Sequence, residues 1–165
     1  MIPEAALYNF SDYESKYDFT IGAIVDFIIT YRHHPHIRRL AMGLINGIPE
    51  RQHKNEAKTI FLYVRDCIPF RKDIRDVETV QTPVQTLELH GGDCDDKTVL
   101  LNALLESVGL KTRVVTVSNI PGGVPLTHVF SQVLIGNNWI SMDTTRKVPF
   151  GAEPAGTTAR NCYEY

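Results

Sequence analysis

Cysteine is scarce in this sequence: three occur in 165 residues, and three cannot all pair within one chain. This number argues against a fold built on disulfide bonds and suits a reducing compartment. Neither sign of charge dominates, because the formal net charge is −2, so nothing indicates attraction to nucleic acid or to an anionic membrane. The longest apolar run, 19–29, is too short to span a bilayer and contains Asp26. The sequence therefore predicts a globular protein with neither nucleic acid nor membrane as a partner.

The composition is ordinary for a globular protein, with 43% hydrophobic and 22% charged residues. A chain of this length can bury a sizeable core, so we expect a single domain over residues 1–165. We interpret residues 1–50 as a helical extension at the N-terminus of this domain. Its surface is a candidate docking site for a protein partner.

The N-terminal third predicts two helices after an irregular beginning. Residues 1–18 show no clear period and predict an irregular lead-in. Thr20 is expected to cap a helix that ends at Tyr31, because threonine favours that position. Pro35 can open a second helix over 36–46.

The middle of the chain predicts a third helix and a short helical turn. Residues 50–67 place apolar side chains at helical spacing. Cys67, at the end of this helix, is expected to fill the core. Residues 70–82 predict irregular chain with one short strand, and Thr82-Pro83 opens a helical turn.

The last third predicts β-structure. Residues 111–118 are dense in β-branched side chains and predict a strand. A loop follows over 119–125, and then a hairpin with strands over 126–135 and 138–145. The tail from Pro149 onward predicts irregular chain.

The stretch Gly91-Gly92-Asp93-Cys94-Asp95-Asp96-Lys97 joins a glycine loop to the start of an apolar helix. Asp93 can cap that helix, whose first N–H groups lack partners within it. Cys94 then lies at the positive end of the helix dipole, which favours a thiolate. The neighbouring carboxylates raise the pKa of the thiol, so a reactive thiol needs a basic partner from elsewhere. The alternative is a buried cysteine that packs as a small hydrophobic residue.

The hairpin can supply such a partner and a carboxylate to orient it. If Gly136-Asn137 is a two-residue turn, Phe130 lies opposite Asp143, and His128 becomes a diagonal neighbour of Asp143 on one face. A three-residue loop would put Asp143 on the other face. Taken singly, His128 also fits an ordinary histidine at a strand start, and Asp143 a surface carboxylate. Together with Cys94 they predict a catalytic triad.

No metal site is predicted. A site of this kind needs several ligands that converge on one ion. His33 and His34 are adjacent and point apart, and Pro35 redirects the chain before His36, so we interpret this segment as a solvated helix junction. The acidic run over 93–96 is an alternative cation site, but the helix dipole explains it better.

These residues carry a resemblance to a known family. The motif over 91–97, the leucine-rich helix after it, the His128-Val-Phe stretch and the segment Trp139-Ile-Ser-Met-Asp143-Thr resemble the transglutaminase-like superfamily. The nearest resemblance is to its small cysteine peptidases of bacteria and phages. The fifteen-residue spacing from His128 to Asp143 fits that pattern. The resemblance covers roughly residues 55–150.

The resemblance implies an α+β fold with a papain-like core, in which the cysteine-bearing helix packs on an antiparallel sheet. It implies that Cys94 is the nucleophile, His128 the general base and acid, and Asp143 the residue that orients the imidazole. No metal or organic cofactor is required. The Cys94 N–H is a natural oxyanion donor. Gln81 and Gln85 are candidates for a second donor, although each also fits a solvated loop residue.

The resemblance further implies a cysteine-dependent hydrolase or acyl transferase that acts on amide bonds, of the peptide or the glutamine type, in a peptide or protein substrate through a thioacyl intermediate. We expect hydrolysis, because nothing in the sequence indicates a dedicated site for an acceptor amine. A cytoplasmic location, or one in a phage particle, fits this class. The alternative is a non-catalytic structural or assembly protein, for example of a phage particle, that keeps the fold and docks through its N-terminal helices.

Overall fold

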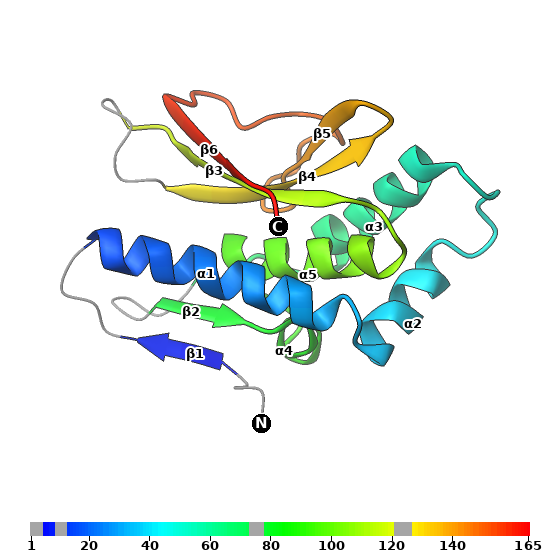
Figure 1. The fold of residues 1–165 in the computed structure, drawn as a ribbon, viewed down its shortest axis with the longest axis horizontal. Coiled ribbons are helices and arrows are strands. Elements are labelled where there is room, and N and C mark those ends of the chain that lie inside the picture. The colour runs from blue at the N-terminus through cyan, green and yellow to red at the C-terminus, as the bar shows by residue number, and fades with distance from the viewer. Residues whose placement is uncertain (1–4, 9–12, 73–77, 121–126) are drawn as a thin grey trace.

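The helix that begins at Cys94 lies at the centre of the molecule. In a computed structural model that describes residues 5–8, 13–72, 78–120 and 127–165, helix α5 (Cys94–Ser107) is buried along almost its whole length. Figure 1 shows the larger sheet on one side of α5, helix α4 (Pro83–Glu88) and a smaller sheet on the other, and helix α1 (Tyr13–Tyr31) alongside α5. Between Val99 and Leu105 every residue of α5 except Asn102 is apolar, so this stretch can be covered on all sides. The predicted α+β fold, with the cysteine-bearing helix against an antiparallel sheet, is confirmed.

The larger sheet has the strand order β5-β4-β3-β6, with every pair antiparallel. Its strands are β3 (Thr112–Ser118), β4 (His128–Ile135), β5 (Asn138–Met142) and β6 (Ala159–Tyr163). The β4–β5 turn is the predicted two-residue turn, because Ile135 pairs with Asn138 and Gly136 adopts a φ of 60°. The predicted register of the hairpin is therefore confirmed.

The N-terminal region differs from the prediction of an irregular lead-in. Strand β1 (Ala5–Tyr8) pairs antiparallel with β2 (Glu78–Gln81), and helix α1 runs over Tyr13–Tyr31. Thr20 is therefore not a helix cap: it is buried inside α1. The pairing partner of β1 lies some seventy residues away along the chain, so no local pattern could indicate this strand.

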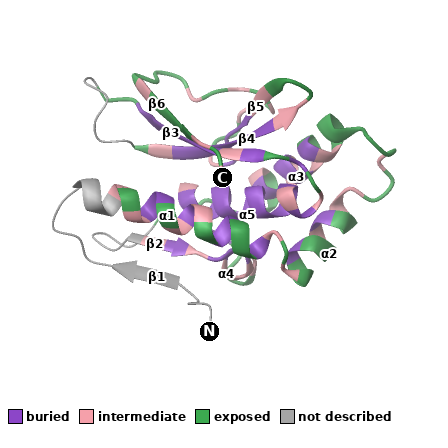
Figure 2. Cartoon of the chain, viewed as in Figure 1, coloured by how far each residue is buried: buried purple, intermediate pink, exposed green. Residues whose placement is uncertain are grey.

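The other predicted helices are present. Helix α2 (Pro35–Leu44) has its proline in the first turn, α3 spans His53–Cys67, and α4 spans Pro83–Glu88. None of the described helices combines the length and the apolar character needed to cross a bilayer. Figure 2 shows that burial concentrates on α5 and on the faces that surround it. Cys67 is exposed, so the expectation that it fills the core is wrong.

The C-terminal tail is not wholly irregular, because β6 adds an edge strand beside β3. The tail ends on Tyr165, whose hydroxyl lies 3.2 Å from Asn102 Nδ2 and 2.8 Å from Thr112 Oγ1. These contacts attach the tail to both α5 and the sheet. Most of the predicted 119–125 loop lies outside the described residues, and so does part of the 70–82 segment. The short strand predicted within 70–82 is present as β2.

Candidate active site

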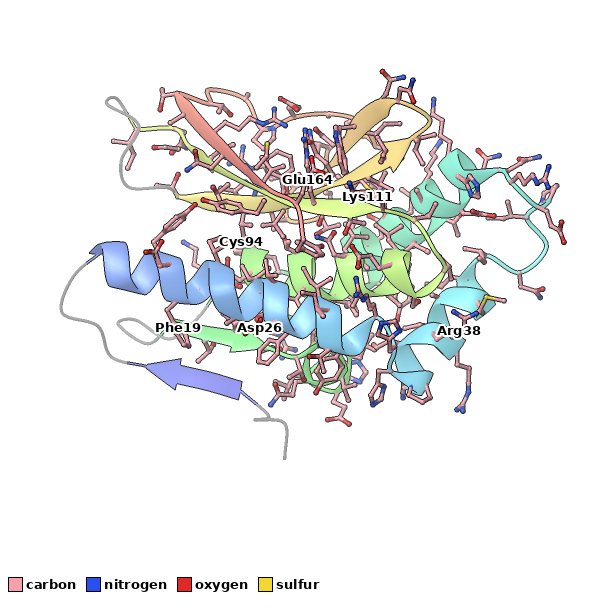
Figure 3. All side chains as sticks on the ribbon, viewed as in Figure 1. Phe19, Asp26, Arg38, Cys94, Lys111 and Glu164 are labelled. Atoms are coloured by element: carbon pink, nitrogen blue, oxygen red, sulfur yellow. The ribbon has the colours of Figure 1, made fainter. Side chains whose placement is uncertain are left out.

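Cys94 is the first residue of α5, as the motif predicts (Figure 3). Asp93 is the N-cap, and its Oδ1 accepts hydrogen bonds from the backbone N–H groups of Asp95 at 3.0 Å and Asp96 at 3.4 Å. Asp96 in turn accepts from the Asp93 N–H at 3.1 Å, which completes a capping box. The cap fixes the backbone on both sides of the thiol.

The sulfur of Cys94 lies in an acidic and largely buried environment. Its thiol donates a hydrogen bond to Asp95 Oδ1 at 3.4 Å. Burial raises the pKa of the Cys94 thiol well above its ordinary value, and the negative charges of Asp95 and Asp93 raise it further. One contact acts in the opposite direction: the backbone N–H of Val129 donates to the sulfur and lowers this pKa.

His128 and Asp143 form a hydrogen-bonded pair, as the hairpin register predicts. His128 Nε2 lies 2.9 Å from Asp143 Oδ2, and the Asp143 side chain is fully buried. The other oxygen, Oδ1, accepts from the Thr145 backbone N–H at 3.0 Å and from its hydroxyl at 2.7 Å. Phe130 stacks on the His128 ring, with centroids 6.1 Å apart. These contacts fix the carboxylate and hold the imidazole by one nitrogen.

The charge state of Asp143 follows from these bonds. Burial acts to raise the pKa of this carboxyl, but the hydrogen bonds from His128 and Thr145 and the charge of His128 outweigh it, and the pKa is lowered. Asp143 is therefore an anion at neutral pH. An anion beside Nε2 suits a histidine that must accept a proton at its other nitrogen.

The structure brings the thiol to the strand that carries His128, since the N–H that contacts the sulfur belongs to Val129, the next residue. Among the described residues, no hydrogen bond joins the Cys94 sulfur to the His128 ring. Asp143 also acts on α5: burial lowers the pKa of Lys97, one turn beyond Cys94, to about 8, and the charge of Asp143 opposes that shift. The cysteine end of α5 and the His128–Asp143 pair are thus neighbours.

The two glutamines proposed as oxyanion donors occupy different environments. Gln85 Oε1 accepts from the Thr82 backbone N–H at 3.0 Å, so its side chain belongs to the cap of α4. Gln81 lies at the end of β2, and its backbone N–H donates to Asp96 Oδ1 at 2.7 Å. The buried side-chain oxygen Oε1 of Gln81 has no hydrogen-bond partner in the part of the chain that the structure describes.

Asp96 and Lys97 make contacts that were not predicted from the sequence. The helix dipole alone was expected to explain Asp96, although an acidic residue three positions after an N-cap indicates a capping box. Lys97 is 1% exposed, and its ammonium donates to the Ile68 carbonyl at 2.6 Å. No local pattern indicated that a lysine beside three carboxylates would be buried.

The polar clusters considered for metal binding have other partners. In the histidine segment, His34 Nδ1 accepts from the His36 backbone N–H at 3.3 Å, as an N-cap. Among the described residues, Asp93, Cys94 and Asp95 offer ligand atoms within 4.8 Å of one another. The contacts described above already place these three side chains in the helix cap and in the thiol hydrogen bond.

Comparison with protein families identifies the class. The family model for the transglutaminase-like superfamily matches residues 38–144, and the chain belongs to this superfamily. This stretch runs from α2 to just beyond Asp143 and contains all three residues of the predicted triad. Comparison with curated protein sequences gives no match.

Two crystal structures with the same fold are similar to this chain. One is a candidate cysteine protease from Cytophaga hutchinsonii, with a TM-score of 0.56 and 20% identity over 87% of this chain. The other is a candidate protease from Parabacteroides distasonis, with a TM-score of 0.56 and 12% identity over 79% of this chain. The alignments span 52% and 27% of those two proteins. At these identities the likeness establishes the fold.

Proposed function

We propose that this protein is a cysteine-dependent hydrolase or acyl transferase that acts on amide bonds. The observation that carries the proposal is the His128–Asp143 hydrogen bond of 2.9 Å, formed where the strand beside the Cys94 sulfur begins. A thiol at a helix start, an imidazole and a buried carboxylate are the three groups that nucleophilic catalysis by cysteine needs. Membership of the transglutaminase-like superfamily supports this assignment.

The chemistry follows from the positions of these groups. With Nε2 bound to Asp143, the other ring nitrogen of His128, Nδ1, takes the thiol proton of Cys94. The thiolate attacks the carbonyl carbon, the C–N bond of the amide breaks, and His128 returns its proton to the leaving amine. Water then attacks the thioester to give a carboxylic acid and the free thiol, whereas an amine would give a new amide.

The transition state needs donors for the oxyanion. The Cys94 N–H is one, since the first N–H groups of a helix have no partner within it. Gln81 is the better candidate for a second, because its side-chain amide makes no hydrogen bond to a described residue, whereas Gln85 holds the cap of α4. We therefore assign the second donor to Gln81.

The substrate is proposed to be a peptide or a protein, with water as the acyl acceptor. Two proteins with this fold are described as candidate proteases, which supports the choice of hydrolysis over transamidation. The chain itself supplies every group of this mechanism: side chains provide the nucleophile and the base, and the Cys94 backbone N–H and the Gln81 amide provide the oxyanion donors, so no cofactor is needed.

A non-catalytic assembly protein is the second candidate, and one observation favours it. The Cys94 thiol donates to Asp95, and its pKa is raised by burial and by two carboxylates. A thiol held in this state would be unreactive unless His128 closes on it. On this proposal the N-terminal helices would be the docking surface.

Alkylation kinetics separate the two candidates. Cys67 and Cys162 are exposed, so iodoacetamide should reach both of them, and they serve as internal references for Cys94. If Cys94 pairs with His128, it reacts at least tenfold faster than the other two at pH 6.5, and His128→Ala removes the difference. Slow labelling of Cys94 in both the wild-type protein and the His128→Ala variant would favour the assembly role.

A further inference from the structure

Asp96 is a buried carboxylate that joins two separate segments of backbone. Its Oδ1 accepts from the N–H of Gln81 in β2 at 2.7 Å, and its Oδ2 accepts from the N–H of Asp93 at 3.1 Å. The residue is 0% exposed. Hydrogen bonds to a buried charged group are among the stronger ones in proteins. The end of β2 is thereby fixed to the backbone on the N-terminal side of Cys94.

The space around this carboxylate is closely filled. A Cβ built on Gly92 would lie 2.5 Å from Asp96 Cβ and 2.8 Å from Asp96 Oδ2. Real Cβ atoms do not approach this closely, so Gly92 is the residue that lets the loop pass over Asp96. The carboxylate has little freedom to shift, and its two hydrogen bonds hold β2 at one position relative to the thiol.

The Gln81 side chain carries a polar group without a protein partner. Its Oε1 is buried, and its amide makes no hydrogen bond to any residue in the described ranges. Buried polar groups of native proteins are nearly always paired, so an orphaned one needs a partner from outside the protein, either water or a ligand. The two ends of a carboxamide have the same shape, and a half-turn would replace Oε1 with the donor Nε2. An amide in this place can therefore donate to a substrate oxygen.

We propose that Asp96 is a positioning residue: it fixes β2 against the start of α5 so that the Gln81 amide donates to the oxyanion formed at Cys94. This inference rests on the proposed function of Cys94. It gives the carboxylate a role distinct from helix capping, because the Asp93 N–H takes one oxygen and the Gln81 N–H takes the other. Loss of the second contact alone would leave the thiol in place and misplace the donor.

Two reactions of the same thiol test the role. Iodoacetamide reacts at a saturated carbon and forms no oxyanion, so its rate reports the thiolate alone. 4-Nitrophenyl acetate reacts through a tetrahedral oxyanion: its carbonyl carbon bonds to sulfur, and nitrophenolate leaves. Removal of one oxyanion donor typically costs about 100-fold or more in rate. Gln81→Ala is therefore expected to slow acetylation of Cys94 by about 100-fold and to leave alkylation unchanged.

Asp96→Asn should have the same selectivity, with acetylation slowed about tenfold at an unchanged alkylation rate. If Asp96 acts through Gln81, it causes no further loss in the Gln81→Ala background. Asp26→Asn, an exchange of the same kind at an exposed site on α1, is the control and should change neither rate. If Asp96→Asn does not fold, Asp96→Ser takes its place in the experiment. Serine keeps one acceptor oxygen on a smaller side chain, so this variant should show the same selectivity.

The outcomes separate this inference from the proposed function. Equal loss of both reactions in the Asp96 variants, or additive losses with Gln81→Ala, would assign Asp96 a structural role only and overturn the inference. Unchanged acetylation in the Asp96 variants would overturn it as well. If the wild-type protein is not acetylated at Cys94 at all, the proposed function fails, and the inference fails with it.

Discussion

At the scale of single residues, the reactivity of Cys94 depends on the carboxylate beside it. Asp95 is 7% exposed, accepts the thiol hydrogen bond, and raises the pKa of the thiol. Asp95→Asn should lower that pKa, because it removes a negative charge that opposes the thiolate. A decrease of one unit corresponds to about tenfold more thiolate at a pH below the pKa. The measurement is the pH profile of Cys94 alkylation.

Asp95→Asn is thus expected to move the profile toward lower pH and to speed alkylation at pH 7 by about tenfold. Asp26→Asn serves as the control for the loss of one carboxylate far from the thiol. An unchanged or slower reaction of the Asp95 variant would show that the carboxylate does not control the thiol.

Lys97 is the residue whose burial the sequence indicated least, and it gives a prediction about stability. Burial lowers the pKa of Lys97 to about 8, against the opposing charges of Asp143 and Asp66. In the unfolded chain the lysine holds its proton up to its ordinary pKa of about 10.4. Between these values the unfolded state binds more protons, so the free energy of unfolding rises with pH.

Lys97→Met should abolish that rise, because methionine fills similar space and does not titrate. Between pH 8 and 9.5 the free energy of unfolding of the wild-type protein should rise by about 1.5 kcal/mol relative to that of the variant. Urea unfolding at both pH values measures the difference. Parallel pH dependence in the two proteins would contradict burial of a titrating lysine.

At the scale of elements, the cap of α5 connects sequence, stability and site. Asp93 accepts from two backbone N–H groups. Asp93→Ala should therefore lower the free energy of unfolding by about 1 kcal/mol. Asp93→Asn retains an acceptor oxygen and should lose much less. Equal losses in the two variants, measured by urea unfolding, would argue that charge rather than capping stabilises this helix start.

The elements that the sequence predicted well are those with local signals. Helices α2 and α4 begin with a proline in the first turn, and α5 begins at its N-cap aspartate. Strands β1 and β6 were missed, because each exists only through pairing with a strand far away in the chain. The first turns of α1 were missed for a related reason: residues 13–18 carry no regular apolar period, and no cap signal indicated a helix start before Thr20.

At the scale of the whole molecule, the site brings together segments that lie far apart along the chain. The sequence shows the order of these segments but not which of them come into contact. The pairing of His128 with Asp143 was predictable, because a two-residue turn fixes the register of a hairpin. The contact between Gln81 and Asp96 was not, because it depends on how β2 packs against α5. The neighbourhood of Cys94 and Val129 likewise required the packing of α5 on the sheet.

The central claim is that Cys94 forms a covalent acyl intermediate with help from His128. The most direct measurement is to treat the whole protein with an acyl-donating electrophile at neutral pH and to map the adduct by mass spectrometry. We expect one acyl group on Cys94, none on Cys67 or Cys162 at the same time, and at least a hundredfold slower reaction in His128→Ala. Acylation that spreads equally over the three cysteines, or that leaves Cys94 unmodified, would contradict it.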